Sequence, residues 1–209
     1  MIRHFDAAVM PRRCAFCGTR CRDHEPDVCR GCYDDLPWRD RLVDRDSPPF
    51  TAVVVPLHYS FPVDAALKAL KFRRRLHYVP VFAELLARLA TALPDDVDAV
   101  LPVPLHWRRE AWRGFNQALE LSARLRKRTG LPLLANVRRD KATAKQSGLD
   151  AAQRRDNLRQ AFAVRGLVDA HHVLIVDDVM TTGETVRQLA QAVLAAGASR
   201  VSALAVARN

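Results

Sequence analysis

The sequence predicts an α/β fold in which a parallel twisted sheet is flanked by helices and preceded by a small cysteine-containing module. Val173–Val176 are four branched apolar residues in a row, which is typical of a strand buried on both faces of a parallel sheet. An amphipathic run follows, with apolar residues at helical spacing from Val186 to Leu194. Two Cys-x2-Cys motifs lie near the N-terminus. The 209 residues suffice for one good-sized core and a small appendage.

Composition and charge narrow the class of protein. The hydrophobic fraction of 49% is typical of a globular chain, and no run approaches the roughly 18 apolar residues of a membrane span. The N-terminus has no apolar segment of the signal-peptide kind, so we expect a cytoplasmic protein without membrane insertion. The 33 Lys and Arg exceed the 23 Asp and Glu, which favours a polyanionic partner. Nucleic acid and a pyrophosphate-bearing sugar both qualify, and a basic surface without a partner is the alternative.

Four of the five cysteines form the two motifs: Cys14, Cys17, Cys29 and Cys32. Two such knuckles about a dozen residues apart predict a tetrahedral structural Zn2+ site, with paired or free thiols as the alternative. Cys21 and His24 lie between the two motifs. They are alternative ligands, but we expect that they do not bind the metal. We therefore assign residues 1–47 to a zinc ribbon and linker, and residues 48–209 to the main domain.

The first half of the main domain predicts one strand and two helices. Arg39–Pro49 is polar and ends in two prolines, so we expect a linker there. Ala52–Leu57 predicts a strand and Val63–Phe72 a short helix. Arg73–Arg75 follow as a basic cluster, either a solvated face or a phosphate contact. Tyr78–Leu93 predicts a second helix with an apolar stripe facing the core.

The second half continues the alternation. Asp98–Leu105 predicts a buried strand, which leads through a basic turn containing His106 into a helix that ends near Thr129. We expect His106 to pack or cap rather than catalyse. The polar stretch Arg138–Asn157 predicts an irregular, mobile segment. Ala161–Val164 then suggests an edge strand, and Val201–Ala207 a further buried strand.

The candidate ligand-binding residues follow the strand Val173–Val176. Asp177 and Asp178 come where the carboxyl end of a parallel strand opens into a crevice, the usual place for ligands in open α/β sheets. The small residues Thr181–Thr185 then lead into a helix, whose free N–H groups and positive dipole end form a phosphate cradle. Ionised carboxylates only accept hydrogen bonds, which suits the vicinal hydroxyls of a ribose. The alternative is an ordinary strand-loop-helix turn with solubilising acids.

This pattern resembles the phosphoribosyl pyrophosphate (PRPP) motif of type I phosphoribosyltransferases. Nearly the whole chain resembles the ComF (ComFC-like) family of competence proteins, through LKALKFRRR at 67–75, PVPLHWRREAWRGFNQ at 102–117, and Thr143-x2-Gln146-x2-Leu149 with a following Arg-Arg-x-Asn. The resemblance implies a type I phosphoribosyltransferase fold with its hood, preceded by a zinc ribbon.

The resemblance also implies roles for individual residues. Asp177 and Asp178 would bind the ribose hydroxyls at the catalytic centre. PRPP would further be held by Thr181, Thr182, Gly183, Glu184 and Thr185 at the 5'-phosphate, and by Arg108 and Arg109 in a pyrophosphate loop. Mg2+ would bridge pyrophosphate and ribose oxygens. A flexible loop over the site would include Lys141, Thr143, Lys145 and Gln146.

Two functions remain open at this point. The first is a PRPP-binding protein implicated in DNA uptake, which transfers or senses 5-phosphoribosyl groups; no base-binding motif identifies an acceptor. The second is a non-catalytic accessory protein that handles single-stranded DNA, with single-stranded DNA and a competence helicase as partners. Its platforms would be aromatic residues beside arginines, Phe72, Trp107 and Trp112, which are equally expected in the core.

Overall fold

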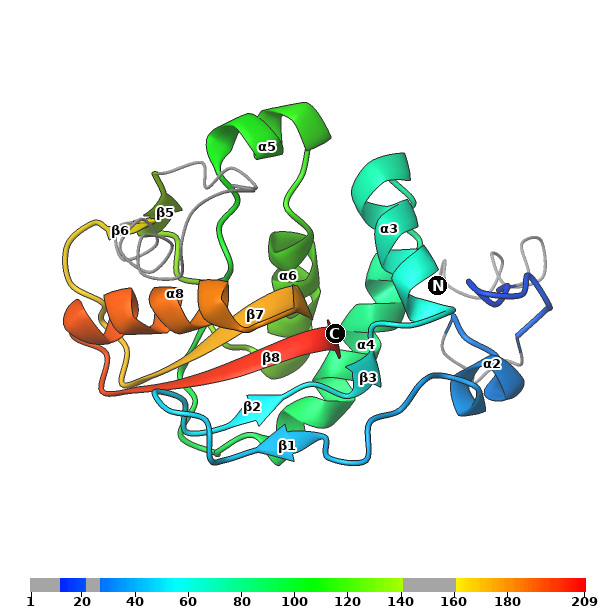
Figure 1. The fold of residues 1–209 in the computed structure, drawn as a ribbon, viewed down its shortest axis with the longest axis horizontal. Helices are drawn as coiled ribbons and strands as arrows, with labels where there is room; N and C mark the ends of the chain where they lie inside the picture. The colour runs from blue at the N-terminus through cyan, green and yellow to red at the C-terminus, as the bar shows by residue number, and fades with distance from the viewer. Residues whose placement is uncertain (1–11, 22–26, 141–160) are drawn as a thin grey trace, which may run out of the picture.

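In the computed structural model the residues described are 12–21, 27–140 and 161–209, and their centre is a twisted six-stranded sheet (Figure 1). Its strand order is β1-β2-β8-β7-β4, with β3 pairing the far end of β8. Every pairing is parallel except that of β1 with β2. The strands are β1 (Val43–Asp44), β2 (Val53–Val54), β3 (Leu57–His58), β4 (Ala99–Pro102), β7 (His172–Met180) and β8 (Arg200–Arg208).

Helices cover both faces of the sheet because its central strands are apolar on both sides. On one face, α3 (Val63–Arg73), α4 (Tyr78–Leu89) and α6 (Gln117–Thr129) pack on Leu174 and Val176 of β7. On the other face, α8 (Glu184–Ala195) packs on Val173 and Ile175. Successive residues of β7 therefore face different helices, as the two-residue period of a strand requires. The remaining elements are α2 (Arg30–Asp34), the 3-10 turn η1 (Ala90–Ala92), α5 (Trp107–Arg113), β5 (Val137–Arg139) and β6 (Phe162–Val164).

The predicted helices and buried strands are largely confirmed, but several details of the sequence prediction are wrong. Ala52–Leu57 is two short strands, because Pro56 has no N–H to continue a ladder. The linker Arg39–Pro49 contains β1, an edge strand of the main sheet. The strand expected over Asp98–Leu105 is limited to β4, which ends at Pro102, and a second proline follows at Pro104.

Three more departures concern the carboxyl edge of the sheet. The basic turn after β4 is a helix, α5. Of the strand expected over Ala161–Val164, Phe162–Val164 pairs as β6 with β5 in a separate antiparallel sheet, so Arg138 and Arg139 belong to a strand rather than to an irregular segment. β7 also does not stop at the acids but continues through them to Met180. The rest of the polar stretch, 141–160, lies outside the described residues.

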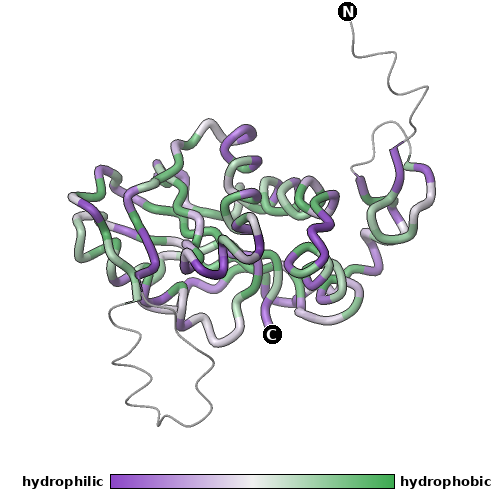
Figure 2. The backbone as a smooth tube through the Cα atoms, turned by 90° about the horizontal axis from the view of Figure 1, so that it is seen from above, coloured by the Kyte–Doolittle hydropathy of each residue, from purple (hydrophilic) through white to green (hydrophobic). Residues whose placement is uncertain are grey.

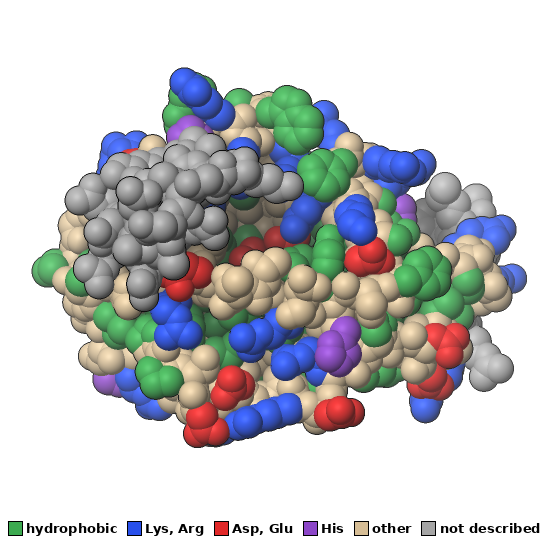
Figure 3. Space-filling view, in the orientation of Figure 1, with side chains coloured by type: hydrophobic (Ala, Val, Ile, Leu, Met, Phe, Trp, Pro, Cys, Tyr) green, Lys and Arg blue, Asp and Glu red, His purple; other side chains and the backbone are tan. Residues whose placement is uncertain are grey.

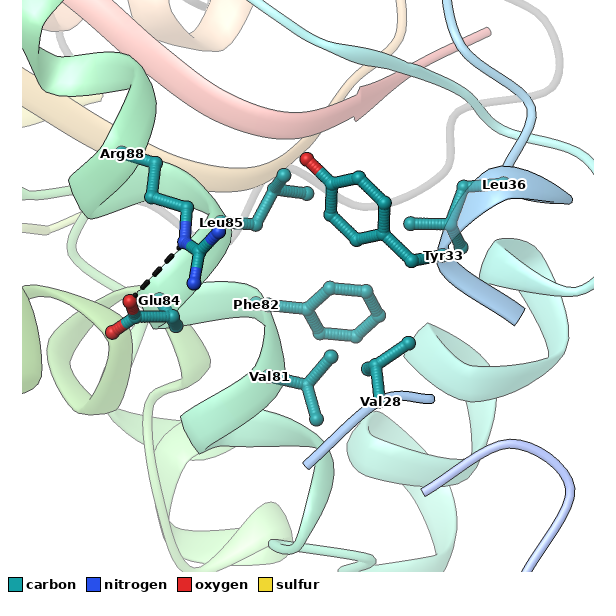
Figure 4. Close-up of a pocket in the computed structure, with 8 residues that line it drawn as sticks. All are labelled: Val28, Tyr33, Leu36, Val81, Phe82, Glu84, Leu85 and Arg88. Atoms are coloured by element: carbon teal, nitrogen blue, oxygen red, sulfur yellow. Dashed lines mark hydrogen bonds and ion pairs between the residues drawn. The ribbon is translucent and has the colours of Figure 1, made fainter. Parts of the chain in front are cut away.

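The cysteine-containing module lies at one end of the molecule, and β5 and β6 lie at the other (Figures 1 and 2). Val28, Tyr33 and Leu36 of the module face Val81, Phe82 and Leu85 of α4 around a cavity of about 20 Å³, beside the Glu84–Arg88 ion pair (Figure 4). The contact is mainly apolar, and Leu36, Phe82 and Leu85 belong to one core cluster, so the module packs on the domain as part of its core. Within the described ranges, no helix has the length and apolarity that crossing a bilayer demands.

Candidate functional site

The two acids lie side by side near the carboxyl end of β7. Asp178 is 7% exposed. Lys71 of α3 contacts it, with 2.6 Å between Lys71 Nζ and Asp178 Oδ2. The neighbouring Asp177 accepts a hydrogen bond at its Oδ1 from the backbone N–H of Asp178 at 2.8 Å. This end of β7 therefore presents two adjacent carboxylates.

Cations surround this acid pair. Burial lowers the pKa of Arg113, at the end of α5, and the negative charge of Asp178 opposes that change. Burial likewise lowers the pKa of Arg139 in β5, and there the charge of Asp177 opposes it. Arg109 of α5 lowers the pKa of both arginines, so its own charge lies close to them. The predicted site residue Arg109 thus shares the site region with Arg113, which lies in the family stretch 102–117, and with Arg139.

The pKa of Asp177 lies well above its ordinary value. Burial is the main cause, and the adjacent charge of Asp178 adds to it. The positive charge of Lys71 acts in the opposite direction. Two carboxylates this close disfavour each other's charge, and cations are what keep such a pair ionised. The protonation of Asp177 therefore depends on the neighbouring charges of Asp178 and Lys71.

The loop after β7 has the geometry expected of a phosphate-binding turn. Gly183 has φ +78° and lies directly before α8, while a side-chain carbon placed on it would meet Met180 Cε at 3.4 Å. Thr181 and Thr182 are exposed, and Thr182 Oγ1 accepts the backbone N–H of Glu184 at 3.4 Å. Free N–H groups at the start of a helix favour an anion. The Glu184 carboxylate instead accepts a hydrogen bond from Gln188 at 2.7 Å, so only its backbone suits a phosphate.

Helix α5 carries the residues of the predicted pyrophosphate loop. His106 is its N-cap and its Nδ1 accepts the backbone N–H of Arg108 at 3.3 Å, which agrees with a capping role. The Arg108 guanidinium lies 5.2 Å from the centre of the Trp107 ring. Of the two predicted arginines, Arg109 affects the pKa of Arg113 and Arg139 through its charge. Arg108 instead stacks on the exposed ring of Trp107. The predicted loop residues Lys141, Thr143, Lys145 and Gln146 lie outside the described residues.

Aromatic and basic side chains form the rim of the site. Phe72 at the end of α3 and Trp112 of α5 are 61% and 73% exposed, and their ring centres are 6.5 Å apart. The Arg113 guanidinium lies 5.7 Å from the Phe72 ring centre. Figure 3 shows a hollow in this face with acidic side chains on its floor and apolar and basic side chains around it. Of the two alternatives left open for these aromatic residues, core or surface, the structure shows the surface.

Three cations near the acids, Lys71, Arg113 and Arg139, were not predicted as site residues. The sequence did carry a signal for Lys71. The buried positions of α3 include Val63, Leu67 and Leu70, and residue 71 continues that stripe at a spacing of four from Leu67. A lysine on the core-facing side of a helix needs a partner, and the twin acids are the partner. No comparable pattern marks Arg139, because its strand was not predicted.

The four predicted metal ligands do come together. The sulfur atoms of Cys14, Cys17, Cys29 and Cys32 all lie within 4.8 Å of one another, and those of Cys17 and Cys29 are 3.7 Å apart. A tetrahedral zinc ion with Zn–S bonds of about 2.3 Å places its sulfurs roughly 3.8 Å apart, so the cluster fits. Hydrogen bonds from Thr19, and weaker ones from Cys14 and Cys32, lower the pKa of Cys17 to about 6. Cys21 lies apart from this cluster, buried against Val28 and Val81.

Comparisons with known proteins identify relatives of this chain. A family model described as the phosphoribosyl transferase domain matches residues 111–209. The DNA utilization protein YhgH of Escherichia coli O157:H7 is 37% identical over 94% of this chain and 90% of its own length. Competence protein F of Haemophilus influenzae is 30% identical over 93% of this chain and 84% of its own. Adenine phosphoribosyltransferase of Leishmania tarentolae aligns with a TM-score of 0.46 at 12% identity, over 80% of this chain and 94% of that one, which is too distant to argue from.

Proposed function

Since the chain belongs to the ComF family of competence and DNA utilization proteins and has the type I phosphoribosyltransferase fold, we propose that its acid site binds PRPP together with Mg2+. The observation that carries the proposal is the pairing of Asp177 and Asp178 with the Thr181–Thr185 loop at one edge of the sheet. The carboxylates accept hydrogen bonds from the ribose hydroxyls, and the loop N–H groups hold the 5'-phosphate. The arginines beside the acids face the diphosphate.

The chemistry proposed for this site depends on the charges that surround the diphosphate and the ribose. Bound Mg2+ supplies neutralisation of the diphosphate, which is otherwise a poor leaving group. Arg109 and Arg113 add positive charge on the α5 side, and the two carboxylates stabilise positive charge that develops on the ribose ring. An acceptor in the hollow would then take the phosphoribosyl group, whereas without an acceptor the protein would sense PRPP. Both uses require the same binding step.

The binding step is tested with the double variant Asp177→Asn and Asp178→Asn. Amide groups keep the shape but lose the charges, so calorimetry with PRPP and Mg2+ should show binding abolished while the circular dichroism spectrum is unchanged. Asp64→Asn is the matched control, because Asp64 lies on α3 in an ion pair with Lys68 outside the site. Wild-type affinity in the double variant would refute the PRPP site. Pyrophosphate release with a panel of bases then distinguishes transfer from sensing.

The cysteine cluster is proposed to hold a structural Zn2+. Four thiolates leave no open coordination position, which is the arrangement of structural rather than catalytic zinc. The module has a small core of its own, formed by Cys14, Cys21 and Val28 against Val81 of α4. A metal centre would therefore supply most of the stability of this segment.

Single-stranded DNA binding is a second function, favoured by the exposed Phe72–Trp112 pair and its arginines. Base stacking on such aromatic residues contributes about 1–3 kcal/mol per base, and the net charge of +10 favours a polyanion. Trp112→Ala should weaken binding of a fluorescent oligonucleotide about tenfold, measured by anisotropy at several salt concentrations. Phe61→Ala is the control, since Phe61 is 82% exposed but precedes α3. If the two variants bind the oligonucleotide with equal affinity, the rim of the site does not bind single-stranded DNA.

A further inference from the structure

Lys71 connects helix α3 to the acid pair, although it lies outside the motif that supplies the acids. Its side chain is 20% exposed, and its ammonium group is in direct contact with the nearly buried carboxylate of Asp178. Lysines on globular proteins usually extend their charged ends into water. Here the side chain lies on the core-facing stripe of α3 and ends inside the candidate site instead. The ammonium group is thus held against a nearly buried carboxylate, where its charge acts directly on the acid.

The end of α3 that presents Lys71 is attached to α5 across the mouth of the site. Arg74 adopts a left-handed conformation with φ 52°, and its Nε donates a hydrogen bond to the backbone carbonyl of Arg113 at 3.0 Å. The Arg74 guanidinium fills the space where a side chain on Gly114 would lie. The Phe72 and Trp112 rings face each other beside this link. The backbone at Lys71 is thereby held in place, while its four-carbon side chain keeps its own torsional freedom.

The other cations near the acids are held by further contacts. Arg113 Nη1 donates a hydrogen bond to Gln117 Oε1 at 2.7 Å. The Arg139 guanidinium lies 5.6 Å from the centre of the Phe162 ring. Lys71, by contrast, carries a compact ammonium group on a flexible stem, which can exchange one anionic partner for another with little rearrangement. Among these groups, Lys71 is the best suited to move when a ligand arrives.

We propose that Lys71 is a positioning residue of the PRPP site, which holds the Asp178 carboxylate in the free protein and transfers its contact to the diphosphate when ribose hydroxyls occupy that carboxylate. This inference rests on the proposed PRPP function and adds a residue from outside the motif. The exchange keeps every charge partnered in both states, because the ribose satisfies the acid by hydrogen bonding and the ammonium group gains a phosphate. It also makes PRPP a better ligand than a ribose phosphate that lacks the diphosphate.

The charge of Lys71 should also affect protonation of Asp177. In the described part of the chain, the charged groups near the pair are Lys71 from α3, Arg113 from α5 and Arg139 from β5, with Arg109 of α5 beside these two arginines. Lys71 opposes the raised pKa of Asp177, so removing it should move the protonation of Asp177 to still higher pH. A protonated acid accepts ribose hydroxyls less well. The affinity for PRPP should therefore fall most at low pH.

The variants are Lys71→Met, which keeps the length and removes the charge, and Lys71→Arg, which keeps the charge. Lys68→Met is the matched control, because Lys68 lies one turn earlier on α3 and pairs with Asp64. The first readout needs no ligand: the carboxyl-carbon signal of Asp177, assigned by its loss in Asp177→Asn, is followed by NMR against pH. Its midpoint should move upward in Lys71→Met and return toward the wild-type value in Lys71→Arg. An unchanged midpoint in Lys71→Met would overturn the inference.

The second readout is calorimetry with PRPP and with ribose 5-phosphate, each with Mg2+. Lys71→Met should weaken PRPP binding about 10-fold to 100-fold, the usual effect of losing a hydrogen bond to a charged group. Ribose 5-phosphate should lose much less, because it has no diphosphate to receive the ammonium group. Equal losses for both ligands, or none, would contradict the exchange. If wild type and Lys68→Met do not bind PRPP, the proposed function fails, and the Asp177 titration still decides whether Lys71 acts on the acids.

Discussion

The cysteine cluster and the acid site differ in how much of the chain each one needs. All four sulfur ligands lie between Cys14 and Cys32, on two short turns that bring them within 4.8 Å of one another. The acid site draws Lys71 from α3, arginines from α5 and β5, and its acids from β7. A metal centre is built from local geometry, whereas a site at a sheet edge depends on the packing of the whole domain. The two regions should therefore fail in different ways.

The largest effect should follow from removing one sulfur ligand by Cys29→Ser. A structural zinc ion contributes about 10–16 kcal/mol in small metal modules, so its loss should unfold the module. Elemental analysis should show loss of bound zinc, and limited proteolysis should cleave residues of the module first, while the PRPP affinity of the main domain stays near wild type.

Cys21→Ala is the control for this experiment. Cys21 is buried near the cluster but is not among its four sulfurs, so this variant should keep one zinc ion per chain. Full zinc content in Cys29→Ser, or its loss in Cys21→Ala, would show that the four-sulfur assignment is wrong.

A smaller effect should follow from disturbing the link between α3 and α5 by Gly114→Ala. Gly114 has φ +82°, which costs a residue with a side chain about 1–2 kcal/mol, and the new carbon would collide with the Arg74 guanidinium. Chemical denaturation should show lower stability, and PRPP should bind more weakly because the backbone at Lys71 is no longer held.

Gly130→Ala separates the two causes. Gly130 has φ +77° at the end of α6, and the space beside it is open, so this variant carries the backbone strain alone. Equal PRPP affinity in Gly114→Ala and Gly130→Ala would mean that the Arg74 contact does not support the site.

The smallest effect should be a gain in stability from Asp177→Asn. Because the pKa of Asp177 is raised in the folded protein, the native state binds more protons than the unfolded chain above about pH 4. The free energy of unfolding therefore falls as the pH rises through the interval between the two pKa values, and an amide removes that loss. Above the interval, Asp177→Asn should be more stable by about 1 kcal/mol.

Thermal unfolding of wild type and Asp177→Asn between pH 5 and pH 9 measures this effect. The asparagine oxygen can still accept the backbone N–H of Asp178, so the two proteins differ mainly in charge. If the unfolding temperatures of the two proteins depend on pH in the same way, the charge of Asp177 does not destabilise the folded protein.

Much of the fold could be predicted because local patterns agreed with the final packing. The run Val173–Val176 and the final strand are central strands, and their branched side chains pack on both faces of the sheet. The failures occur where neighbours decide the outcome. Arg138 and Arg139 are polar and lie in a polar stretch, yet they form β5 because Phe162–Val164 pairs with them. The segment that became α5 has no apolar stripe, and its cap at His106 gave the only local indication of a helix.

The sequence by itself determined the ligand chemistry: four thiols at metal-binding spacing, and two acids followed by a small-residue loop at the start of a helix. These features are local, since each depends on residues a few positions apart and on backbone geometry that short segments adopt. Only the tertiary structure decided that Lys71 contacts one of the acids and that the Phe72 and Trp112 rings meet at the rim. The physical reason is that such contacts join segments far apart in the chain, and their free energy exists only after the sheet and helices have packed.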